Sequence, residues 1–151
     1  MPKYRADFID AAIGVNTTIG SHGASSATQA RRHKLLELFV GIEDPADQVA
    51  RLVAQRYTVD GTGTAVVPTP LDPADAAMLG EAAEAHTVEP TYTGVLYVAA
   101  FDIHMRNPLL YYAPPGGEIV VPATDDSGIG YWWADISSGT PSAMATVLLE
   151  E

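Results

Sequence analysis

The chain has 151 residues, of which 47% are hydrophobic and 18% are charged. This length supports one hydrophobic core and leaves no room for a second full domain, so we expect a single domain over residues 1–151. Eight Lys and Arg residues against 19 Asp and Glu residues give a net charge of −11, which disfavours a nucleic-acid partner because phosphate binding relies on basic side chains. The absence of cysteine excludes disulfides, thiolate metal ligands and a thiol nucleophile.

The first residues predict no targeting segment. Residues 1–8 mix acidic, basic and apolar side chains and lack the continuous apolar stretch of a secretory signal. No part of the chain approaches the roughly 18 apolar residues that a membrane span requires. We therefore expect a protein made in the cytoplasm, with no membrane partner.

The first half of the chain predicts two strands separated by a loop. Residues 1–15 are expected to form an amino-terminal strand or arm, with the strand over 4–15, and residues 33–42 form the next strand. Between them, residues 16–28 are rich in Gly, Ser, Thr and Ala and predict a flexible loop.

The tetrapeptide Asp-Pro-Ala-Asp occurs at residues 44–47 and 72–75, and each copy can start a helix because Asp caps the first turn and Pro presets its backbone. The Ala-rich segment after the second copy predicts one short helix near residues 73–85. After the first copy, Val49, Val53, Tyr57 and Val59 share one face of an extended segment, so we predict a strand over 49–59, with a helix over 45–56 as the alternative.

From residue 92 onward, short apolar segments alternate with turn sequences every 8–12 residues, a pattern typical of a β-sandwich or jelly roll. The predicted fold is therefore mainly β, a single antiparallel β-sandwich or jelly roll. Strands are expected at residues 92–105, 109–113, 118–122, 129–136 and 143–149.

Motifs for catalysis or metal binding are weak. His22, His33, His86 and His104 lie at least eleven residues apart, so no pair has the spacing of metal ligands within one element. The serines lie in Gly- and Thr-rich segments typical of turns, and the adjacent carboxylates at 43–44, 125–126 and 150–151 are expected on the solvated surface. We predict no catalytic residue, no cofactor and no metal site.

The aromatic doublets Tyr111-Tyr112 and Trp132-Trp133 fall in predicted strands, where successive side chains point to opposite faces. One member of each doublet must therefore leave the core. Burial against a second subunit or another partner is the favoured explanation, and cover by a loop is the alternative. We also expect the amino-terminal strand to contact a partner. The predicted interface residues, toward a second subunit or another partner, are Tyr4, Phe8, Ile9, Tyr111, Tyr112, Trp132 and Trp133.

Pro- and Gly-containing stretches give the sequence a resemblance to a known family. They lie at residues 61–75, 86–93, 113–124 and 128–130, together with the opening residues 4–6 and the closing residues 146–151. In these stretches the chain resembles the capsid decoration, or cement, proteins of tailed bacteriophages. The shared residues are structural and include no catalytic group.

The resemblance implies a jelly-roll β-sandwich that binds the outer surface of the assembled shell. It implies a homotrimer, the phage major capsid protein as partner, and a location on the virion. Residues 1–57 hold seven of the eight basic residues, whereas residues 58–151 hold thirteen acidic residues and only Arg106. On this interpretation the near-neutral first part faces the shell and the acidic part faces solvent.

Two other functions stay open at this point. The exposed aromatic rings could stack on sugar rings, which would make the chain a carbohydrate- or receptor-binding module of a phage fibre or surface protein. Alternatively, histidines distant in sequence could converge in a small metal-dependent jelly-roll enzyme.

Overall fold

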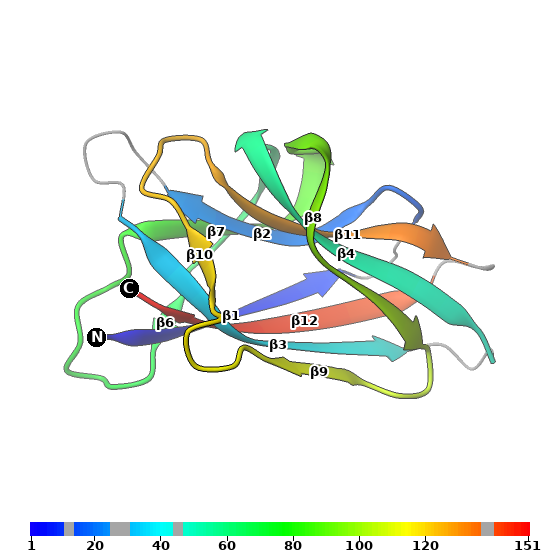
Figure 1. Ribbon diagram of the computed structural model, residues 1–151, viewed down its shortest axis with the longest axis horizontal. Helices are drawn as coiled ribbons and strands as arrows, with labels where there is room; N and C mark the ends of the chain where they lie inside the picture. Colours follow the sequence, from blue (N-terminus) through cyan, green and yellow to red (C-terminus); the bar gives the residue numbers. More distant parts are fainter. Residues whose placement is uncertain (11–13, 25–30, 44–46, 137–140) are drawn as a thin grey trace.

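The computed structural model describes residues 1–10, 14–24, 31–43, 47–136 and 141–151. Its regular structure is entirely β, with 67% of the residues in strands, and two six-stranded antiparallel sheets pack face to face as a sandwich (Figure 1). The predicted mainly β sandwich is therefore confirmed. The described ranges contain no helix, and so no helix that could cross a membrane.

Sheet A has the strand order β10-β3-β12-β1-β6, and β9 pairs with the same edge of β3 as β10. Its strands are β1 (Lys3–Asp10), β3 (His33–Glu43), β6 (Thr69–Pro70), β9 (Leu109–Tyr112), β10 (Ile119–Val121) and β12 (Ser142–Glu150). Sheet B has the order β5-β7-β2-β11-β4-β8. Its strands are β2 (Thr18–Ala24), β4 (Val49–Val59), β5 (Thr62–Val66), β7 (Gly80–Val88), β8 (Thr91–His104) and β11 (Gly128–Ile136).

One core fills the space between the sheets. Along β12, alternate residues from Ala143 to Leu149 are buried, while their neighbours face outward. On the opposite sheet, Ile129, Tyr131 and Trp133 of β11 are completely buried. This alternation gives each sheet one inner face and one outer face, and the two outer faces lie on opposite sides of the molecule.

The helix predicted over residues 73–85 is wrong. Asp72 does cap a turn, since its carboxylate accepts a hydrogen bond from the backbone N–H of Ala74 at 2.9 Å and its carbonyl accepts one from Asp75 at 3.0 Å. The chain then continues into β7, which pairs with β2 on one side and β5 on the other. Pairing on both sides outweighs the modest helix preference of alanine.

The flexible loop predicted over residues 16–28 is wrong for most of its length. Residues 18–24 form β2, a completely buried strand between β7 and β11. Its two glycines are required by close approaches: a Cβ on Gly20 would lie 2.2 Å from the Phe8 ring, and one on Gly23 would lie 2.3 Å from the Tyr57 hydroxyl. Residues 25–28 lie outside the described part of the chain.

The strand over 49–59 is confirmed as β4, and the alternative helix is excluded over its described residues. The predicted face is only partly correct, because Val53 and Tyr57 are buried whereas Val49 and Val59 are exposed. The remaining predicted strands correspond to β1, β3, β8, β9, β10, β11 and β12. The strand predicted over 4–15 is too long, because β1 ends at Asp10 and residues 14 and 15 lie outside any strand.

Residues 1–57 do not form one face of the molecule. They contribute β1 and β3 to sheet A but β2 and β4 to sheet B. The strands of sheet A hold three basic and five acidic residues, and those of sheet B hold two basic and four acidic residues. Most of the negative charge therefore lies in the connections, and the expected split into a neutral side and an acidic side does not follow the layers.

Candidate functional site

The structure shows which member of each aromatic doublet leaves the core. Tyr111 turns inward and packs against Phe101 with ring centroids 5.6 Å apart, whereas Tyr112 is 58% exposed. Trp133 is completely buried, and Trp132 is half-buried on the outer face of sheet B. The outward side chains are thus Tyr112 on sheet A and Trp132 on sheet B.

The amino-terminal strand is part of the sandwich and is not a detached arm. β1 pairs with β12 along its whole length and with β6 at Tyr4 and Arg5. Tyr4 and Phe8 are buried in the core, where the Tyr4 hydroxyl donates to the carbonyl of Ala76 at 3.0 Å. Together with Trp133 they offer a partner no exposed surface. Of the predicted β1 residues, only Ile9 is exposed, at 64%.

Exposed apolar side chains gather on the outer face of sheet A because the strand register places them opposite one another. Ile9 lies opposite Met144, which lies opposite Gly41, and in the next row Phe39 lies opposite Leu110. In a third row, Glu37 of β3 lies between Leu148 and Tyr112. We call this surface the sheet A patch, and it consists of Ile9, Phe39, Leu110, Tyr112, Met144 and Leu148.

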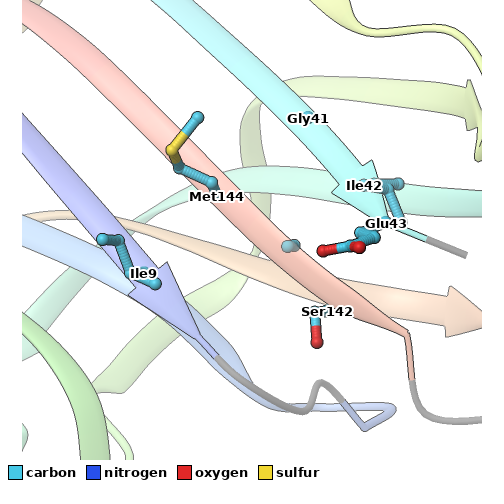
Figure 2. Close-up of a pocket in the computed structure, with 7 residues that line it drawn as sticks. Ile9, Gly41, Ile42, Glu43, Ser142 and Met144 are labelled. Carbon is cyan, nitrogen blue, oxygen red and sulfur yellow. The ribbon is translucent and has the colours of Figure 1, made fainter.

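One end of the sheet A patch is hollowed. Figure 2 shows Ile9 on β1 and Met144 on β12 side by side, with Gly41 on the neighbouring β3. The hollow has a volume of about 520 Å³ and is also lined by Ile42, Glu43, Ser142 and Ala143. Because Gly41 carries no side chain, the apolar surface dips between the strands at this point.

Ion pairs border the sheet A patch, and in each pair the basic side chain neutralises the charge of a carboxylate. Arg5 lies 2.9 Å from the carboxylate of Asp7, which also accepts a hydrogen bond from the Thr146 hydroxyl at 2.6 Å. Lys34 lies 3.8 Å from Glu150. An apolar surface with a rim of paired charges is the usual composition of a protein–protein interface.

A second concave surface lies on the outer face of sheet B, around Trp132. Tyr92 and Tyr97 of β8 contact the indole, with ring centroids 5.8 Å and 6.4 Å from it. The cleft has a volume of about 470 Å³, and its other lining residues are Asn16, Gln55, Glu89 and Gly94. Sheet A and sheet B thus each present one aromatic-containing site to the outside.

Two of the four histidines, His22 and His33, lie side by side in the core, although they are eleven residues apart in the sequence. Nδ1 of His22 lies 2.8 Å from Nε2 of His33, and Nε2 of His22 lies 2.8 Å from the Tyr131 hydroxyl. Burial holds the pKa of His22 well below its usual value and lowers the pKa of His33 to about 4, the nearby backbone of Arg31 offsetting part of the decrease at His33. Both imidazoles are therefore neutral at pH 7 and link β2, β3 and β11 by hydrogen bonds.

Polar groups also meet near β7. The Ser21 hydroxyl lies 3.0 Å from Nε2 of His86, and Ser21, although buried, lines a hollow of about 250 Å³ together with Asp60 and Glu81. Burial raises the pKa of Glu81 to about 7, with further contributions from the adjacent carboxylate of Asp60. Within the described ranges, no group of three or more His, Asp or Glu side chains is arranged to hold a metal ion.

Sequence reasoning missed most of the sheet A patch. Phe39, Met144 and Leu148 lie on predicted strands, and alternation along those strands could have placed them on the outer face together. The meeting of β1, β3, β9 and β12 in one sheet could not be derived that way.

Comparison with protein-family models, with curated proteins and with solved structures finds no match for this chain.

Proposed function

We propose that this chain is a non-enzymatic structural protein of a phage virion. It assembles into a homo-oligomer, a trimer on the resemblance to decoration proteins, and binds the outer surface of the assembled major capsid shell. The observation that carries the proposal is the sheet A patch, with four side chains between 41% and 64% exposed: Ile9, Leu110, Tyr112 and Met144.

The sheet A patch suits a protein partner. A strand face that presents Ile, Leu, Met and Tyr side chains together has a lower free energy when another protein covers it than when it faces water. Aromatic residues and Met are enriched at the centres of interfaces, while paired charges such as Arg5 and Asp7 are typical of the rim. This matches the arrangement on sheet A.

A second copy of the chain is the partner we assign to the sheet A patch. Two chains of net charge −11 repel each other unless they meet through surfaces that carry little net charge. Glu37, between Leu148 and Tyr112, is the carboxylate that lies among the apolar side chains of the patch, and the nearby basic side chains of Arg5 and Lys34 are paired with carboxylates. The acidic connections can then remain in solvent at the outside of the oligomer.

Shell binding follows from mass action and needs no chemistry. A protein that binds only the assembled shell stabilises it in proportion to its occupancy. An oligomer that contacts several capsid subunits at once multiplies weak single contacts through effective concentration. The capsid part of the proposal rests on the resemblance, and the oligomer part rests on the sheet A patch.

The oligomer is tested by sedimentation equilibrium of the purified chain. We expect an oligomer whose dissociation constant rises about 30-fold in Met144→Lys and in Leu110→Lys, which corresponds to about 2 kcal/mol at a central contact. Val88→Lys is the matched control, because Val88 is a strand residue of sheet B that is 59% exposed. A monomeric wild-type chain, or an equal effect of all three substitutions, would refute the assignment of the patch.

Shell binding is tested separately by co-sedimentation of the chain with expanded empty capsids built from the major capsid protein encoded with it. We expect saturable binding to expanded shells and none to unassembled capsid subunits. Absence of binding by an oligomeric wild-type chain would reject the capsid role and leave the oligomer intact.

A further inference from the structure

The cleft around Trp132 has no part in the proposed function. It lies on the outer face of sheet B, on the opposite side of the sandwich from the sheet A patch. A copy that is held through sheet A therefore keeps this cleft open to solvent. Its volume of about 470 Å³ falls within the range of about 300–1,000 Å³ that is usual for small-molecule sites.

Trp132 contacts both tyrosine rings, and all three rings line the cleft. The planes of Tyr92 and Trp132 are inclined by only 33°, and Tyr97 meets the indole nearly edge-on at 61°. Tyr97 is 49% exposed, and the other two rings are half-buried. Gly130 makes this arrangement possible, since a Cβ there would lie 2.3 Å from the Tyr92 hydroxyl.

Hydrogen bonds fix these side chains before any ligand arrives. Trp132 Nε1 donates to Gln55 Oε1 at 3.0 Å, and the Gln55 amide in turn donates to the carbonyl of Gly94. The Tyr92 hydroxyl lies 2.6 Å from the hydroxyl of Thr18. A ligand therefore pays little conformational entropy to order the aromatic surface.

Polar groups stand at the rim of the cleft. The carboxylate of Glu89 accepts a hydrogen bond from the backbone N–H of Thr18 at 3.1 Å, which fixes its position. Asn16 is anchored by its backbone N–H, which donates to the carbonyl of Trp133 at 2.7 Å. Glu89 and Asn16 are both exposed, so an acceptor and an amide are available to hydroxyl groups above the rings.

We propose that this cleft binds a neutral saccharide. The C–H face of a sugar ring packs on an aromatic surface, and its hydroxyls bond to carboxylate and amide groups such as those of Glu89 and Asn16. An acidic sugar is disfavoured by Glu89 and by the net charge of −11. A quaternary ammonium ligand is disfavoured because the rings pack against one another and do not surround an open centre.

The test uses the full chain on an array of immobilised oligosaccharides, neutral and acidic, with choline as a further probe in solution. We expect retention on neutral saccharides, and titration of the best of them into Tyr97→Ala should show affinity at least ten-fold weaker than in the wild type. Tyr112→Ala is the control, because it removes an equally exposed tyrosine from sheet A. Thermal unfolding of both variants verifies that each is folded.

Three results would overturn the proposal: no retention on any neutral saccharide, preference for acidic saccharides or choline, and unchanged affinity in Tyr97→Ala. None of them bears on the oligomer or on shell binding. Conversely, a monomer that binds saccharides would reject the oligomer and support the cleft.

Discussion

Acidification should destabilise the fold through the buried pair His22 and His33. In an unfolded chain a histidine has a pKa near 6.5, whereas burial lowers the pKa of His33 to about 4. The unfolded state therefore binds more protons than the folded state between these two values, so the free energy of unfolding is fully retained above pH 6.5 and decreases as the pH falls toward 4.

The magnitude follows from the two pKa values of His33. Between pH 7 and pH 5, His33 alone should lower the free energy of unfolding by about 2 kcal/mol. The pKa of His22 is also lowered by burial, so His22 adds a decrease of the same sign. Protonation of either ring would place a charge in the core beside its neighbour, 2.8 Å away.

Glu81 opposes this effect and must be removed for a clean measurement. Its pKa is raised to about 7, so the folded state holds its proton more tightly and Glu81 adds stability below pH 4.5 that is lost as the pH rises toward 7. Glu81→Gln eliminates that contribution. We therefore expect a steeper loss of stability on acidification in Glu81→Gln than in the wild type.

The assay is urea unfolding followed by tryptophan fluorescence at pH 7 and pH 5. For each protein we compare the change in the free energy of unfolding between pH 7 and pH 5, which is informative even where a variant is less stable overall. The proteins are the wild type, Glu81→Gln and the double variant Glu81→Gln/His33→Gln. Replacement of His33 should reduce that change by about 2 kcal/mol. Equal unfolding free energies at both pH values in Glu81→Gln would refute the burial argument.

Two further predictions concern the aromatic residues. Trp133→Ala should leave a cavity in the core and lower the free energy of unfolding by about 3–5 kcal/mol. Trp133→Phe should lower it much less, because Phe fills most of the space and Nε1 of the indole has no hydrogen-bond partner in the described ranges. Chemical unfolding compares the two variants, and equal losses would contradict the cavity argument. Gly130→Ala should displace the Tyr92 ring and lower the free energy of unfolding by about 1–3 kcal/mol. The double variant Gly130→Ala/Tyr92→Ala should recover most of this loss, and an unrecovered loss would show that the strain lies elsewhere.

The cleft and the sheet A patch differ in how far sequence could reveal them. The doublets Tyr111-Tyr112 and Trp132-Trp133 predicted that one ring of each would leave the core, because strand side chains alternate. The sequence did not show which ring of each doublet faces outward, because this depends on which face of each strand packs against the other sheet. Tyr92, Tyr97 and Gln55 join Trp132 only because β8 and β11 both pair with β4.

The sequence by itself determined the class of this protein: a cysteine-free, acidic β-sandwich with turns at its Pro- and Gly-rich segments. Such local signals are strong because turn residues and period-two alternation act over a few positions. It could not identify β2, whose glycines, serine and histidine look like a loop. They are suited to a buried strand only because Phe8, Tyr57, His33 and Tyr131 approach from other elements. Tertiary packing therefore decides the structure of this segment. Residues distant in the chain place rings where only glycine leaves enough room, and they supply the hydrogen bonds of the histidine.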